Sequence, residues 1–150
     1  MTSQEVEKLS HEEHILKLPD TYIGSVEKTT DNIWIFDEDK NEMKKNNISY
    51  VPGEYKIYDE ILVNAVDQHI RMREKFKSNN SINLVKNIKV NINEELGEIS
   101  VFNDGDGIPI EIHEKEKIWI PELIFGHLLT SSNYSSTKKI KHVGGKNGYG

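Results

Sequence analysis

The chain has 150 residues, no cysteine, and 25 acidic against 19 basic side chains, which gives a formal net charge of -6. This length suits one domain, or a piece of one, with a modest core. The lack of cysteine excludes a disulfide scaffold, cysteine-based zinc sites and thiol catalysis. No apolar run approaches the roughly 18 residues of a membrane-spanning helix, and the polar start carries no secretory signal. We expect an intracellular, soluble protein that does not contact a membrane. Its net negative charge argues against nucleic-acid binding that relies on charge alone.

Residues 1–32 are predicted to form an N-terminal arm. Apolar residues spaced between Glu5 and Leu18 allow a short helix there. Pro19-Asp20 is expected to end that helix, and Gly24 marks a turn.

Two short apolar segments follow the arm, Ile33–Phe36 and Ile48–Val51, and both are predicted to be β-strands. The charged stretch Asp37–Asn47 between them is interpreted as a solvent-exposed loop. Pro52-Gly53 is then a strong turn signal.

The segment Glu54–Met72 is the clearest predicted helix. At 100° per residue, a group of polar side chains falls within about 40° of one line. This group, the polar strip, consists of Lys56, Glu60, Asn64, Asp67 and Arg71. Apolar residues occupy most of the remaining circumference, the reverse of an ordinary surface helix, so we expect burial on most sides. Packing alone can explain the strip; alternatively, Glu60 activates water and Asn64 binds a hard cation such as magnesium.

After this helix, the spacing of apolar residues changes from that of a helix to the alternation of a β-strand. Apolar residues alternate with polar ones over Ile88–Ile92, and Ile99 and Val101 alternate with Ser100 and Phe102, with a turn at Glu94–Gly97 between the two segments. Such a pattern predicts an antiparallel hairpin. A helix is predicted over Pro121–Leu129, with proline at its first position.

Three polar loops carry groups suited to a nucleotide. In Asn103–Pro109, two glycines permit close backbone approach and Asn103 can hydrogen-bond a base edge, although a plain turn is the commoner explanation. Leu129–Tyr134 offers hydroxyl and amide groups, which also serve as helix caps. Gly144–Gly150 has four glycines in seven residues, a pattern typical of backbone amides turned toward phosphates or of a flexible linker.

Taken together and in this order, these elements resemble the N-terminal ATPase domain of eukaryotic-type DNA topoisomerase II, within the gyrase, chaperone, histidine-kinase and mismatch-repair ATPase superfamily. The resemblance covers roughly residues 9–150, and its most specific stretches are Pro19–Ser25, Val51–Ala65 and Leu128–Tyr134. Asn103 also stands where gyrase-like enzymes carry aspartate. The implied fold is an α/β (α+β) sandwich of the Bergerat type, with a mixed, mostly antiparallel sheet and helices on one face. Residues 33–150 would form the ATP-binding domain.

The resemblance also implies roles for single residues. Glu60 corresponds to the general base, Asn64 to the magnesium ligand beside the nucleotide, and Asn103 to the residue that recognises adenine. Tyr22 lies in the segment that contributes to the dimer gate. The other positions implied to bind the cofactor line the adenine, contact ribose and phosphates, or begin the ATP lid: Gly107, Ile108, Ser131, Ser132, Asn133, Gly145, Lys146, Asn147, Gly148, Tyr149 and Gly150.

The resemblance implies an ATP- and Mg²⁺-dependent homodimer that passes one DNA duplex through a transient double-strand break in another. Its location would be the nucleus of a eukaryote, or the host cell or virion of a virus. The tyrosine and acidic metal site that break DNA match no stretch here. Because the chain stops within the lid, we expect a truncated domain that binds nucleotide weakly and hydrolyses little on its own.

Three other interpretations remain open from the residues. One is a different ATPase of the same superfamily, a chaperone or mismatch-repair protein. Another is a non-catalytic module that dimerises when nucleotide binds. The third is a metal site at His11 and His14, whose i, i+3 spacing permits one but which lacks the further ligands that metal sites normally have.

Overall fold

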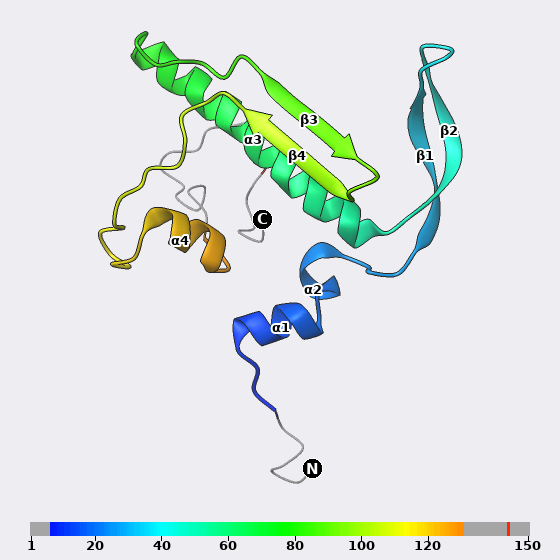
Figure 1. Cartoon of the computed structure of the whole chain (residues 1–150), viewed down its shortest axis with the longest axis horizontal. Helices are drawn as coiled ribbons and strands as arrows, with labels where there is room; N and C mark the ends of the chain where they lie inside the picture. The colour runs from blue at the N-terminus through cyan, green and yellow to red at the C-terminus, as the bar shows by residue number, and fades with distance from the viewer. Residues whose placement is uncertain (1–6, 131–143, 145–150) are drawn as a thin grey trace. The chain divides into compact units, whose positions relative to one another are not determined.

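The computed structural model describes residues 7–130 together with Gly144. The chain divides into two units, residues 1–57 and 58–150, and helix α3 runs through the boundary between them. Within the described residues the strands form two separate two-stranded antiparallel sheets, β1-β2 and β3-β4 (Figure 1). The elements in chain order are α1 (His11–Lys17), α2 (Asp20–Ile23), β1 (Thr29–Asp37), β2 (Glu42–Tyr50), α3 (Pro52–Ser78), β3 (Ile88–Asn93), β4 (Glu98–Asn103) and α4 (Ile120–Gly126).

The first unit begins with the predicted short helix, which is confirmed as α1. Ser10 caps it with a capping box, because its hydroxyl accepts from the Glu13 amide while the Glu13 carboxylate accepts from the Ser10 amide. Pro19-Asp20 ends α1 as predicted, but a second helical turn, α2, follows directly. Gly24 then turns the chain with a φ of 85°, a conformation that favours glycine.

The β1–β2 hairpin is more extensive than predicted. The interpretation of Asp37–Asn47 as a solvent loop was wrong, because β2 already begins at Glu42. Polar cross-strand pairs stabilise the ladder: the Thr30 and Ser49 hydroxyls lie 2.6 Å apart, and the Asn32 amide donates to Asn47 at 2.8 Å. Strands held by such pairs lack the apolar alternation that marks a strand in a sequence.

Helix α3 is confirmed and is longer than predicted, with 27 residues. The expected turn at Pro52-Gly53 is instead the first turn of this helix, where proline is well tolerated because its missing N–H has no intrahelical partner. Gly53 is buried, and its amide donates to the Ser25 carbonyl at 2.8 Å. A Cβ at Gly53 would lie 3.0 Å from the Ile23 Cδ1 atom, so glycine allows this close approach.

The second unit contains the other predicted elements. β3 and β4 form the expected antiparallel hairpin, with Ile88 paired to Asn103 at one end and Asn93 to Glu98 at the other. Gly97 completes the tight turn with a φ of 61°. Helix α4 has Pro121 in its first turn as predicted but ends at Gly126, before Leu129.

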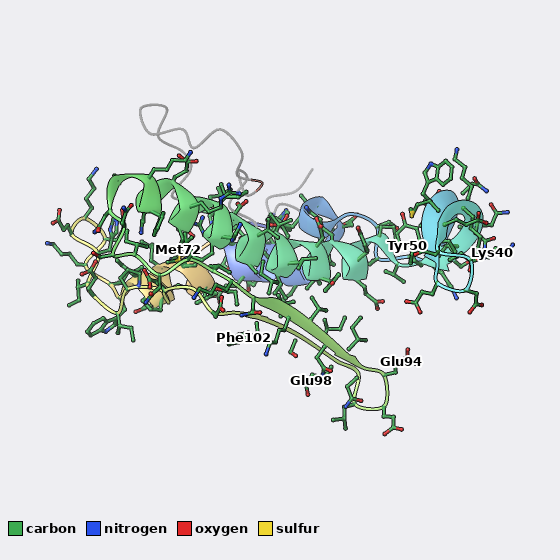
Figure 2. The ribbon with its side chains drawn as sticks, turned by 90° about the horizontal axis from the view of Figure 1, so that it is seen from above. Lys40, Tyr50, Met72, Glu94, Glu98 and Phe102 are labelled. Atoms are coloured by element: carbon green, nitrogen blue, oxygen red, sulfur yellow. The ribbon has the colours of Figure 1, made fainter. Side chains whose placement is uncertain are left out.

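The apolar core of the described residues is small and consists of Ala65, Met72 and Val85. Figure 2 shows the β3–β4 hairpin leaving the axis of α3, so that the turn at Glu94 and Glu98 lies away from the helix. Apolar side chains on both elements therefore remain exposed: Ile61 is 49% exposed, Ile92 60% and Ile99 50%. The expectation that α3 is buried on most sides is not met in the described residues, where only Gly53, Ala65, Asp67 and Met72 of this helix are buried.

None of the helices within residues 7–130 combines the length and the apolarity that crossing a bilayer requires.

Met72 is 1% exposed whereas Met43 is 55% exposed, which makes them a matched pair. Met72→Ala is expected to lower the free energy of unfolding by about 2–5 kcal/mol, because it removes buried methylene and sulfur contacts and leaves a cavity. Met43→Ala should change it by less than about 0.5 kcal/mol. Urea unfolding followed by circular dichroism measures both, and equal effects would contradict the placement of the core at Met72.

Candidate nucleotide site

The polar strip of α3 does not face a single environment. Glu60 is half-buried and Asn64 is exposed, whereas Asp67 is only 2% exposed. Arg71, half-buried, donates from Nε to the Gln68 Oε1 atom at 3.3 Å. The strip therefore combines an exposed amide with a buried carboxylate, one helical turn apart.

The loop that follows β4 is fastened to α3. Gln68 Nε2 donates to the Asp106 carbonyl at 3.0 Å, and the Asp106 amide donates to the Met72 Sδ atom at 3.4 Å. At Gly105 the loop passes so close to the preceding segment that a Cβ would lie 2.7 Å from the Val85 Cγ2 atom. The glycines of this loop were expected to let the backbone approach a flat ligand, whereas the close approach at Gly105 is to Val85.

Asn103 is the last residue of β4 and is half-buried. Its Oδ1 atom accepts from the Gly105 amide at 3.2 Å, which orients the side-chain amide. Among the described residues nothing accepts a hydrogen bond from its Nδ2 group. Gly107 has open space where a Cβ would stand, and Ile108 is 38% exposed. This end of the loop is open to a ligand.

Asp104 fixes the start of the same loop. Its Oδ1 atom accepts from the Lys86 amide at 2.8 Å and the Asn87 amide at 3.0 Å, and its Oδ2 atom accepts from Asn87 Nδ2 at 2.8 Å. These hydrogen bonds, led by the one from the Asn87 backbone, lower the pKa of the Asp104 carboxyl to about 2. The carboxylate thereby ties the β4 loop to the segment that enters β3.

Gly144 lies on the polar strip of α3. Its amide donates to the Asp67 Oδ1 atom at 2.7 Å, across 77 residues of sequence. A Cβ at Gly144 would lie 2.8 Å from the Val63 Cγ1 atom. The first residue of the glycine-rich segment is thus seated on the helix that carries Glu60 and Asn64.

Two of the predicted site residues, Glu60 and Asn64, lie on α3. Asn103 ends β4, and Gly107 and Ile108 lie in the loop after it. This loop contacts α3 at Gln68 and Met72. The remaining predicted positions lie outside the described residues: Ser131, Ser132, Asn133, Gly145, Lys146, Asn147, Gly148, Tyr149 and Gly150.

Sequence reasoning missed the residues that hold this arrangement in place. Gln68 and Met72 follow Asn64 at intervals of four, a spacing that marks one side of a helix. Asp67 was noticed only as a member of the polar strip. Nothing in the sequence marks Asp104 and Asn87 as partners, since they are 17 residues apart in loops of similar composition.

The described part of the chain contains no group of three or more His, Asp or Glu side chains arranged to hold a metal ion. His14, one of the two histidines considered for such a site, has its Nδ1 atom 2.8 Å from the Tyr22 hydroxyl oxygen.

No family model matches the chain. The chain is 58% identical over 148 residues to DNA topoisomerase 2 of Meyerozyma guilliermondii, an alignment that covers 99% of this chain and 10% of that protein. The crystal structure of the ATPase region of Saccharomyces cerevisiae topoisomerase II matches with a TM-score of 0.83 and 54% identity over 98% of this chain and 36% of that chain. The ATPase and transducer domains of DNA topoisomerase II from Balamuthia mandrillaris match with a TM-score of 0.84 and 44% identity, over 99% of this chain and 35% of that one.

Almost the whole of this chain therefore matches part of the ATPase region of eukaryotic DNA topoisomerase II, which confirms the predicted resemblance. The mixed α/β character with antiparallel strand pairs is confirmed with it. The chain spans about 10% of the length of the curated relative and about 36% of the solved yeast chain.

Asp104→Asn is expected to lower the thermal midpoint at pH 7 by a few degrees, because the new amide group faces the Asn87 amide donor. The folded pKa of about 2 lies below the ordinary value of 3.8, so the contribution of Asp104 to stability is present above about pH 4 and is lost as the pH falls through about 2.

Thermal unfolding of both proteins between pH 7 and pH 2 measures this dependence. The difference between wild type and Asp104→Asn should shrink below pH 4. The control is Asp106→Asn, since the Asp106 carboxylate accepts no hydrogen bond from a described residue. A difference that stays constant down to pH 2 would show that the Asp104 carboxylate is not bound as described.

Proposed function

We propose that the chain forms part of the ATP-binding gate of a type IIA DNA topoisomerase. Such an enzyme couples ATP hydrolysis to the passage of one DNA duplex through a transient double-strand break in another. The proposal rests on the match of 98% of the chain to a solved topoisomerase II ATPase region. The named relatives are topoisomerases, which favours this function over that of a chaperone or mismatch-repair ATPase.

The adenine would bind at the open end of the β4 loop. The Nδ2 group of Asn103 donates to no described residue and can donate to the base edge. Gly107 offers backbone without a side chain, and Ile108 offers a partly exposed apolar surface for the flat ring. The hydrogen bond from Gly105 holds the Asn103 amide in one orientation before any ligand arrives.

The triphosphate would lie along the polar strip. Glu60 would act as general base and take the proton of the attacking water. The exposed Asn64 side chain makes no hydrogen bond to a described residue, so its carbonyl oxygen can hold a magnesium ion. A single protein ligand fits Mg²⁺, which usually keeps several waters and binds nucleotide phosphates. When bound, the ion neutralises charge that develops on the phosphates.

The remaining assignments extend the same proposal. Ser131, Ser132 and Asn133 would contact ribose and phosphates, and the backbone amides of residues 145–150 would surround the triphosphate. The fold would complete to a Bergerat-type sandwich, with one mixed sheet covered by helices on one face. Two such domains would associate as a homodimer near Tyr22. DNA would be held by the whole enzyme, in the nucleus if the source is eukaryotic.

The general-base role is tested in a chimaera of Saccharomyces cerevisiae topoisomerase II in which this chain replaces its aligned segment. Glu60→Gln should slow ATP hydrolysis by roughly 10²–10⁴-fold, because the amide cannot accept the proton of water. Binding of a non-hydrolysable ATP analogue should change little. Glu54→Gln, at an exposed position of the same helix, is the control. Unchanged turnover in Glu60→Gln would show that Glu60 is not the general base.

The adenine role is tested in the same chimaera. Asn103→Ala should weaken ATP binding roughly tenfold, as the loss of one hydrogen bond to the base would, and should reduce the preference for ATP over GTP. Asn91→Ala, an exposed residue of β3, is the matched control. Nucleotide affinities from isothermal titration calorimetry give both quantities. A tenfold loss that is equal for ATP and GTP would place Asn103 away from the base.

A further inference from the structure

We propose that Asp67 is a positioning residue that seats Gly144 on α3 and thereby sets the affinity for the phosphate end of the nucleotide without touching it. The inference rests on the proposed function, in which the residues after Gly144 contact the phosphates. The observation behind it is the hydrogen bond of 2.7 Å from the Gly144 amide to the Asp67 Oδ1 atom.

The burial of Asp67 makes this hydrogen bond consequential. The residue is 2% exposed, and a carboxylate removed from water is costly unless donors solvate it. A backbone amide that donates to an ionised oxygen forms one of the stronger hydrogen bonds in proteins. Displacing Gly144 would remove one donor from a buried carboxylate, which is unfavourable.

The steric contact with Val63 supports the same placement independently. A Cβ built on Gly144 would lie 2.8 Å from the Val63 Cγ1 atom, a separation that real Cβ atoms essentially never show. The backbone of Gly144 therefore touches the helix, and a side chain at this position must push it away. Hydrogen bond and contact involve two different residues of α3, one turn apart.

Asp67, which binds the Gly144 amide, belongs to the same polar strip as Glu60 and Asn64. Asp67 follows Asn64 by three residues and Glu60 by seven, so all three lie on one face within two turns. Phosphoryl transfer depends on position, and a misplacement of about 1 Å can cost about 10²-fold in rate. The adenine loop, by contrast, is held by Gln68 and Met72 through Asp106.

This separation of contacts predicts a selective effect. Loss of the Asp67 carboxylate should weaken contacts to the phosphates and leave those to adenine intact. A residue that serves only stability would instead weaken both together. The ratio of the affinities for an ATP analogue and for adenosine therefore distinguishes the two roles.

The experiment uses the yeast ATPase region carrying this segment, titrated calorimetrically with a non-hydrolysable ATP analogue and with adenosine. Asp67→Ala should lower the affinity for the analogue roughly tenfold, whereas the affinity for adenosine stays within about twofold. Asp67→Asn retains an acceptor oxygen and should lose less. Glu74→Gln, at an exposed position on α3, should leave both affinities unchanged. Parallel losses for analogue and adenosine in Asp67→Ala would overturn the inference.

A second set of variants tests the position of Gly144 against α3. Gly144→Ala should weaken binding of the analogue because its Cβ meets Val63, and the double variant Val63→Ala/Gly144→Ala should recover most of the loss because the smaller side chain makes room. If the double variant does not recover binding, the proposed contact between Gly144 and Val63 is contradicted.

If the unsubstituted chimaera binds no ATP analogue, the proposed function fails. The hydrogen bond between Gly144 and Asp67 is then tested separately by amide hydrogen exchange in the 150-residue chain. The Gly144 amide should exchange slowly in wild type and rapidly in Asp67→Ala; equal rates would overturn the inference.

Discussion

The arrangement of the candidate site depends on one helix. α3 holds the loop after β4 through Gln68 and Met72, and it holds Gly144 through Asp67. The same helix carries Glu60 and Asn64 on its polar strip. A rigid helix keeps such groups at constant separation more reliably than loops alone do. Its 27 residues are therefore the frame on which groups from distant parts of the chain are arranged.

Polar contacts, more than apolar packing, hold the loops on this frame. The described core comprises Ala65, Met72 and Val85, and apolar faces of α3 and of the β3–β4 hairpin remain exposed. The β4 loop is instead held on α3 by hydrogen bonds to Gln68 and Met72, and three hydrogen bonds accepted by Asp104 tie it to the segment before β3. A further directional hydrogen bond, from the Gly105 amide to Asn103 Oδ1, orients the Asn103 side chain, and no described residue accepts from its Nδ2 group.

Local periodicity explains which elements were predictable. The interval of about four residues in α3 and the alternation of Ile88, Val90 and Ile92 are properties of single segments, and the corresponding elements were confirmed. The β1–β2 hairpin was underestimated because its strands are held by polar pairs such as Thr30 with Ser49. The parts that were missed, residues 29–32 and 42–47, carry no apolar alternation to reveal them, and the pairing exists only once the two segments meet.

The sequence by itself determined the helix with its polar strip, the β3–β4 hairpin, and the resemblance that the comparisons confirmed. Tertiary structure decided which polar residues are buried and what they bind. Asp67 and Asn64 are both polar members of one strip, yet only Asp67 is buried, beneath a glycine 77 residues away. The partner of a hydrogen-bonding group depends on which distant segment comes within about 3 Å of it, and that distance is a property of the folded chain.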